Sequence, residues 1–105
     1  MRYDKLVRDL VPGIIREVGE LPITHRADDE EYADRLLEKL REELDEYETS
    51  GEIEELADLL EVIRALGQMN GVGWAELDEM RAQKARERGG FEERLILDEI
   101  RPAPS

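Results

Sequence analysis

The sequence contains no cysteine, a single histidine and few aromatic residues: one tryptophan, three tyrosines and one phenylalanine. The absence of cysteine excludes disulfides, thiolate metal sites and cysteine nucleophiles, and one histidine is too few for a multi-histidine zinc site. No apolar run approaches the ~18 residues that a bilayer span requires, and the first residues do not resemble a signal peptide. We therefore expect a cytoplasmic protein that does not bind membranes.

Basic residues are also scarce, because 15 lysines and arginines stand against 28 acidic residues, which gives a net charge of −13. A chain this acidic is not expected to bind a nucleic-acid backbone through a basic patch. The charge fits solubility, cation binding or both. With 105 residues, the chain is expected to form one domain over residues 1–105, with a modest core that a second subunit can complete.

Apolar residues recur at intervals of three and four, which is the helical period, and predict four helices. A short helix is expected from Pro12 to Gly19, and a second from Asp28 to about Glu48, where Asp28 and Glu31 form a capping box. Further helices are expected between a cap at Ser50 and the Asn70-Gly71 pair, and from about Trp74 to Arg88. The fold class is therefore all-α, an antiparallel bundle of about four helices.

The remaining segments are expected to be extended or irregular. Residues 1–9 form an extended arm, and residues 101–105 form a frayed tail that contains prolines. Residues 21–26 alternate weakly between apolar and polar types and predict a short strand, residues 94–100 (RLILDEI) predict another, and the two strands can pair. They would give the helical domain a small β appendage.

Four acidic residues lie at mirror positions around the turn at Ser50-Gly51. Glu43 and Asp58 are equally far from the turn, and so are Glu46 and Glu55. If the flanking helices are antiparallel, the four carboxylates form a rectangle of about 8–10 Å by about 4.5 Å. Inward-pointing oxygens at that spacing can hold a hard divalent cation, and a site without histidine or cysteine favours magnesium over zinc.

The positions of two of these carboxylates argue for a role, although acidic pairs are common in such a chain. Glu43 lies in the apolar row of its helix between Leu40 and Tyr47, and Glu55 lies four residues before Leu59. A carboxylate at an inward position is costly unless it is paired or bound to a metal. Two interpretations stay open: a metal site, or a helix rim at which Glu43 and Glu55 pair with arginines.

Two pairs of basic residues are candidates for phosphate binding. Lys5 and Arg8 lie in the segment KLVRD, and Lys84 and Arg88 are spaced i, i+4 on the predicted fourth helix. The alternative for both pairs is ordinary salt bridging with neighbouring glutamates. Together with an acidic metal site, these cations indicate a metal-assisted reaction on a phosphate substrate.

The acidic segments also resemble a family signature. EELDE, which begins at Glu42, and ELAD, which begins at Glu55, are similar to the E-E-x-x-E … E-x-x-D pattern of the all-α nucleotide pyrophosphohydrolases. This superfamily includes MazG-like and phosphoribosyl-ATP pyrophosphohydrolase-like enzymes. The opening YDKLVRDLVPGII and the closing KARERGGFEERLIL resemble a compact branch of it, so the similarity covers about residues 3–100. The eight residues between Glu46 and Glu55 are fewer than is usual in MazG-like members.

The resemblance implies magnesium-dependent cleavage, with manganese as a substitute, between the α and β phosphates of a nucleoside triphosphate. The products would be a nucleoside monophosphate and pyrophosphate, and two roles stay open, cleansing of the nucleotide pool or a step on a specific metabolic substrate. It implies the metal ligands Glu43, Glu46, Glu55 and Asp58. It implies phosphate contacts from Lys5, Arg8, Lys84 and Arg88. The proton acceptor would be Glu42 or one of the ligand carboxylates, and helix packing would form a homodimer or homotetramer.

Two other functions remain open at this point. One is an acidic helical dimer that senses a nucleotide or binds a basic protein without catalysis. The other is the histidine-biosynthesis enzyme that acts on phosphoribosyl-ATP. The KLVRD arm argues against the second, because the arm belongs to the branch that only resembles that enzyme.

Overall fold

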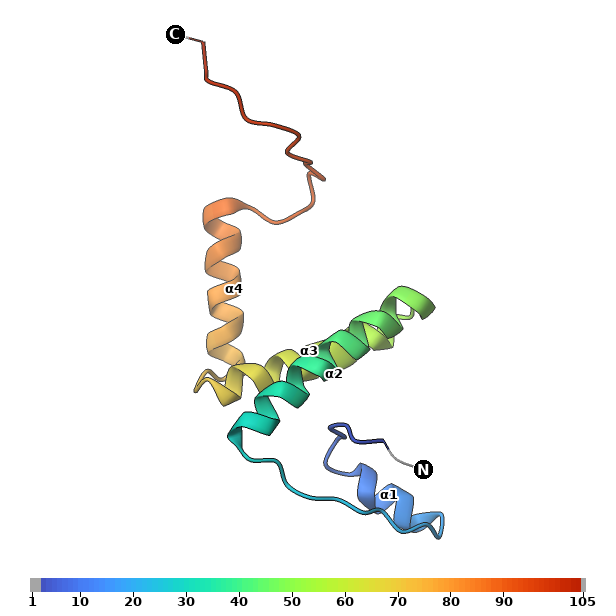
Figure 1. Cartoon of the computed structure of the whole chain (residues 1–105). Coiled ribbons are helices and arrows are strands. Elements are labelled where there is room, and N and C mark those ends of the chain that lie inside the picture. Colours follow the sequence, from blue (N-terminus) through green and yellow to red (C-terminus); the bar gives the residue numbers. More distant parts are fainter. Residues whose placement is uncertain (1–2, 105) are drawn as a thin grey trace. The chain divides into compact units, whose positions relative to one another are not determined.

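The computed structural model describes residues 3–104 and contains four helices and no strand within that range. The helices are α1 (Val11–Glu17), α2 (Asp29–Ser50), α3 (Ile53–Met69) and α4 (Trp74–Arg88) (Figure 1). The prediction of an all-α chain with four helices is therefore confirmed. The bounds of α4 agree with those predicted from the sequence, and α2 runs two residues further than predicted.

The chain divides into two compact units, Met1–Trp74 and Ala75–Ser105. The first unit contains α1, α2 and α3, and the second contains all of α4 except its first residue, followed by an irregular segment. No helix in the described part of the chain is long and apolar enough to cross a membrane. The organisation as one domain over residues 1–105 stays a prediction.

Local signals in the sequence explain where α1 and α2 begin. Pro12 lies in the first turn of α1, where its missing N–H is not needed. Gly19, with φ of 84°, follows the end of α1. The Asp28 side chain accepts a hydrogen bond of 2.9 Å from the backbone N–H of Glu31, as the capping motif predicts. Both helix starts are therefore set by residues that the sequence identifies.

A turn of two residues connects α2 to α3. Gly51 ends α2 in the left-handed conformation, with φ of 67°, and its N–H donates a 2.8 Å hydrogen bond to the carbonyl of Tyr47. The prediction that Ser50 caps α3 is wrong, because Ser50 is still the last residue of α2. Its hydroxyl instead accepts a 3.2 Å hydrogen bond from the N–H of Glu52, which precedes α3 without a side-chain cap of its own.

We expect Gly51→Ala to lower the free energy of unfolding by about 1 kcal/mol, because alanine enters the left-handed region only at a cost. A Cβ at this position meets no atom within 4 Å, so the loss reports backbone strain and not a clash. The control is Gly13→Ala inside α1, where the Cβ is equally free and φ is ordinary. Urea unfolding should show no loss for Gly13→Ala, and an equal loss in both variants would contradict the prediction.

The core of the first unit lies between α2 and α3, which pack against each other as an antiparallel hairpin (Figure 1). Leu36 and Val62 are the buried apolar residues, at 2% and 7% exposure, and Glu43 is buried beside them at 6%. Several larger apolar side chains of the two helices stay more than a third exposed: Leu37, Leu44, Leu60 and Ile63. The hairpin therefore has the small core that the chain length predicts.

One detail of the predicted fold, the β appendage, is corrected. Residues 21–26 and 94–100 are not strands, so the described chain has no β appendage. A strand needs a partner for its backbone N–H and C=O groups, and within residues 3–104 neither segment pairs with another one; the Arg94 N–H makes only a local hydrogen bond, to the carbonyl of Phe91. Pro22 also lacks an N–H, and Arg94 has a φ of 57°, which is outside the strand region. Within the first unit α2 and α3 form an antiparallel hairpin, and a bundle that includes all four helices stays a prediction.

Candidate metal centre

The hairpin brings carboxylates from α2 and α3 together. Glu43, Glu55 and Asp58 each offer an oxygen within 4.8 Å of the others, and so do Glu42, Glu43 and Glu46. Glu43 belongs to both groups. The structure therefore gathers the four ligands predicted from the mirror positions and places Glu42 beside them.

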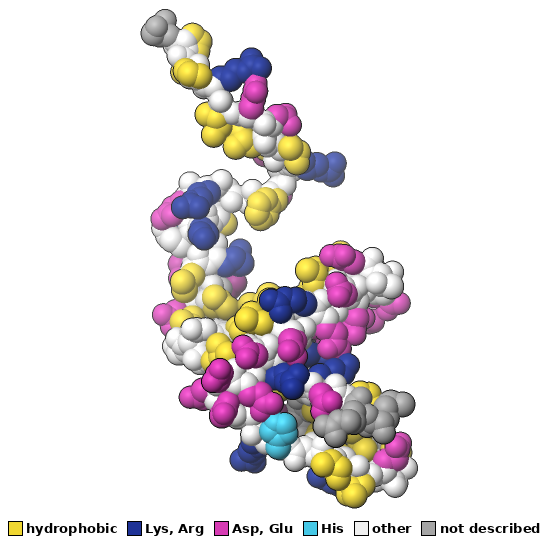
Figure 2. Space-filling view, in the orientation of Figure 1, with side chains coloured by type: hydrophobic (Ala, Val, Ile, Leu, Met, Phe, Trp, Pro, Cys, Tyr) yellow, Lys and Arg dark blue, Asp and Glu magenta, His cyan; other side chains and the backbone are white. Residues whose placement is uncertain are grey.

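The cause of this convergence is the short turn between the helices. Because only Gly51 and Glu52 separate α2 from α3, residues equally far from the turn stand at similar heights on facing helices. Acidic side chains cover much of the visible surface of the hairpin (Figure 2). What distinguishes the cluster from that surface is the burial of Glu43 and the partial burial of Glu42, Glu55 and Asp58, whereas Glu46 is exposed.

Two carboxylate oxygens in the cluster are buried without a hydrogen-bond partner: Oε2 of Glu43 and Oε2 of Glu55. A buried carboxylate oxygen with no donor is unfavourable, and such groups in native proteins usually have a partner or an ion. Lysines and arginines occupy other oxygens of the cluster, but not these two. An all-oxygen donor set suits a hard cation such as Mg²⁺ or Mn²⁺, so the residues present fit the predicted metal.

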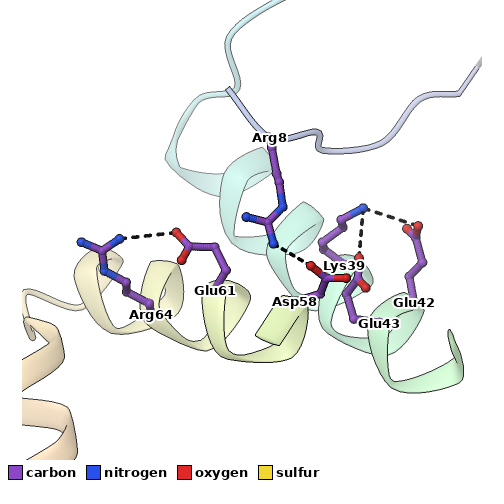
Figure 3. A network of polar contacts seen from close by, with 7 residues as sticks. All are labelled: Arg8, Lys39, Glu42, Glu43, Asp58, Glu61 and Arg64. Atoms are coloured by element: carbon purple, nitrogen blue, oxygen red, sulfur yellow. Dashed lines mark hydrogen bonds and ion pairs between the residues drawn. The ribbon is translucent and has the colours of Figure 1, made fainter. Parts of the chain in front are cut away.

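The N-terminal arm reaches this cluster from a distant part of the sequence. Arg8 Nη2 donates a 2.8 Å hydrogen bond to Oδ1 of Asp58 (Figure 3), and Lys5 Nζ donates one of 3.0 Å to Oε1 of Glu42. These pairs are partly exposed, so each contributes at most about 1 kcal/mol to stability. Their importance is positional, because they place two of the predicted phosphate-binding residues beside the carboxylates.

Lys39 is a member of the cluster that the sequence analysis missed. Its Nζ lies 3.4 Å from Oε1 of Glu42 and 3.4 Å from Oε1 of Glu43 (Figure 3), and its side chain is 19% exposed. The signal was present in the sequence, because residues three and four apart on a helix are neighbours. In an acidic chain, that spacing is also typical of an ordinary ion pair on the surface of a helix.

The two lysines change the acidity of Glu42. Partial burial alone would raise its pKa, but the ammonium groups of Lys5 and Lys39 outweigh burial and lower the pKa below its ordinary value. Glu42 is therefore held as a carboxylate, and it is a weaker base than a free glutamate while both lysines contact it.

Glu43 and Glu55 shift in the opposite direction. Burial raises the pKa of Glu43, and the neighbouring Glu46 carboxylate raises it further, although Lys39 opposes the shift. Desolvation, together with the charges of Glu46, Asp58 and Glu43, raises the pKa of Glu55 to about 7. Three carboxylates crowd around Glu55, so its charged form is disfavoured unless a cation is present.

The remaining predicted site residues, Lys84 and Arg88, belong to α4 in the second unit. Within the described residues neither makes an ion pair, whereas Arg81 pairs with Asp78 at 2.9 Å and Arg86 pairs with Glu79 at 2.6 Å. A site that combines Lys84 and Arg88 with the carboxylates would draw on residues of both units, and it stays a prediction.

The shift at Glu55 predicts a pH dependence of stability. Its pKa rises from 4.5 to about 7 on folding, so the folded chain binds the proton more tightly than the unfolded chain. In EDTA, this stabilising contribution is complete below about pH 4.5 and is lost as pH rises through about 7. Metal competes with the proton, so the increase in Tm caused by Mn²⁺ should be larger at about pH 8 than at about pH 6. Differential scanning calorimetry can measure both effects.

The matched variant for this measurement is Glu55→Gln, which removes the titrating group. Its Tm in EDTA should vary less with pH than that of the wild type over the same range. If both proteins show the same pH dependence in EDTA, the assignment of the effect to Glu55 is wrong.

Comparisons of the chain with protein-family models, with curated proteins and with solved structures found no match. The resemblance to the nucleotide pyrophosphohydrolases therefore rests on the motifs alone. The geometry of the carboxylates and their basic neighbours is the feature of this chain that bears on function.

Proposed function

We propose that the chain is a magnesium-dependent nucleotide pyrophosphohydrolase that cleaves between the α and β phosphates of a nucleoside triphosphate. The observation that carries the proposal is the pair of buried, unpartnered oxygens on Glu43 and Glu55 within a carboxylate cluster. The resemblance of the EELDE and ELAD segments to the family signature supplies the reaction. The basic residues of the arm, which contact this cluster, supply a reason for a phosphate substrate.

In this proposal Glu43, Glu46, Glu55 and Asp58 hold the metal. A magnesium ion bound there would neutralise phosphate charge and lower the pKa of a bound water. Lys5 and Arg8 would bind the phosphates, exchanging their present carboxylate partners for phosphate oxygens. Lys84 and Arg88 are proposed to contribute from α4.

The proton acceptor in this proposal is Glu42. Lys5 and Lys39 now lower its pKa, which weakens it as a base. A phosphate group that draws Lys5 away would remove one of these two charges, so Glu42 would become a stronger base when substrate is bound. Substrate binding and proton transfer would then be linked through one lysine.

We also propose that a second copy of the chain completes the core. Only Leu36 and Val62 are buried apolar residues in the described chain, whereas Leu37, Leu44 and Leu60 on the same hairpin stay 43–50% exposed. Helix packing between two hairpins would cover them in a homodimer or homotetramer, as the resemblance implies. Analytical ultracentrifugation can distinguish these states from a monomer.

The test is a nucleotide panel that includes standard and damaged nucleoside triphosphates and phosphoribosyl-ATP, assayed for pyrophosphate release with Mg²⁺ or Mn²⁺. The proposal predicts turnover of at least one compound and no turnover in EDTA. Turnover of phosphoribosyl-ATP alone would identify the biosynthetic enzyme instead. Thermal stabilisation by metal and nucleotide without any turnover would show a nucleotide sensor and would contradict the proposed activity.

A further inference from the structure

We propose that Lys39 is a positioning residue that orients Glu43 toward the metal, an inference that rests on the proposed metal centre. Lys39 lies one helical turn before Glu43 on α2, and its ammonium group reaches Oε1 of both Glu42 and Glu43 at 3.4 Å. The close view shows the Lys39 ammonium group joined by a dashed line to each of the two carboxylates (Figure 3). No part of the family signature includes this lysine.

The contact makes the two oxygens of Glu43 different. Oε1 faces the Lys39 ammonium, whereas Oε2 is buried and has no hydrogen-bond partner. A ligand carboxylate that is held through one oxygen presents the other to the metal, which is the usual role of an outer partner in a metal site. Glu43 belongs to both carboxylate groups, so its orientation affects the whole cluster.

Lys39 suits this role better than the basic residues of the arm. The side chains of Lys5 and Arg8 are 42% and 57% exposed, whereas that of Lys39 is 19% exposed. Lys39 also lies on the same helix as Glu43, so the spacing between the two backbones is set by α2 itself. A site built on a regular element and supported by a mostly buried partner holds its geometry most closely.

The direction in which metal affinity changes when Lys39 is removed distinguishes a positioning role from a purely electrostatic one. If Lys39 acts only as a positive charge near the cation, its removal reduces repulsion and metal binds more tightly. If Lys39 orients Glu43, its removal weakens binding, and loss of such an outer partner typically costs 10–100-fold in metal affinity. We therefore expect that removal of Lys39 weakens metal binding.

The experiment is calorimetric titration of the full chain with Mn²⁺. We expect Lys39→Met to raise the Kd by about 10–100-fold, and Lys39→Arg to restore most of the affinity. The control is Arg35→Met, which removes a positive charge one turn earlier on α2, where Arg35 pairs with Glu38 at 3.1 Å and not with the cluster. Its Kd should stay close to that of the wild type. Lys39→Gln should behave as Lys39→Met does, and it replaces that variant if circular dichroism shows that Lys39→Met does not fold.

A second pair of variants tests whether Lys39 affects metal binding through Glu43. In a Glu42→Gln background, Lys39→Met should still weaken Mn²⁺ binding, because the effect does not depend on Glu42. Loss of the effect in that background would overturn the inference, as would a Lys39→Met protein that binds Mn²⁺ as tightly as the wild type or more tightly. If the wild type itself binds no Mn²⁺, the proposed metal centre and its function fail, and that result is distinct from the other two.

Discussion

Glu55→Gln is expected to lower pyrophosphate release by at least about 100-fold and to remove most of the metal-induced increase in Tm. Even outer partners of metal ligands typically account for 10–100-fold in affinity or activity, and Glu55 would be a ligand itself. Its Oε2 is buried without a partner, and the crowding of Glu46, Asp58 and Glu43 disfavours its charge unless a cation is present. Steady-state kinetics and thermal unfolding with Mg²⁺ measure the two effects.

The matched control is Glu54→Gln, the preceding residue of α3, which is exposed and outside both carboxylate groups. It removes the same charge from the same helical turn and should leave activity nearly unchanged. In EDTA, Glu55→Gln should be at least as stable as the wild type, because it relieves repulsion in the cluster. Full activity in Glu55→Gln, or an equal loss in Glu54→Gln, would contradict the proposed metal centre.

Leu36→Ala is expected to have the largest effect on stability, with a loss of about 2–5 kcal/mol in the free energy of unfolding. Leu36 is 2% exposed and is the most deeply buried side chain of the α2–α3 hairpin. In a chain of this size such a loss lowers Tm by roughly 10 °C or more. Because the core is small, few other contacts compensate for the cavity. Urea unfolding and calorimetry measure the change.

The neighbouring residue provides the control for this prediction. Leu37→Ala removes the same atoms from the same helix, but Leu37 is 43% exposed. Leu37→Ala should lower the free energy of unfolding by about 1 kcal/mol, which is less than the effect of Leu36→Ala. Equal losses would show that the two leucines are similarly buried in solution, which would point to a second copy covering Leu37.

The helices were predictable because their signals are local. Intervals of three and four between apolar residues, a proline in a first turn and an aspartate cap act within one or two turns of helix. The same locality explains the success at the hairpin, since the predicted interruption of the helical pattern, which the structure places at Gly51 and Glu52, sets α2 and α3 side by side. This placement brings Glu43 of α2 close to Glu55 and Asp58 of α3.

The errors concern features that depend on partners elsewhere in the chain. Residues 21–26 and 94–100 have weak strand patterns, but a strand forms only where another segment satisfies its backbone groups. The alternation of a few apolar residues does not determine whether such a partner exists. The prediction that Ser50 caps α3 was wrong because α2 continues through Ser50 and ends at Gly51.

The sequence by itself determined the four helices, the tight turn and the identity of the carboxylates that meet across it. Only the tertiary structure decided which oxygens are buried without partners, that Lys5 contacts Glu42, and that Arg8 contacts Asp58, a residue fifty positions away in the chain. The physical reason is that helix formation depends on neighbours within a few residues. Burial and ion pairing depend on where side chains from distant segments come to lie, and composition alone does not specify those contacts.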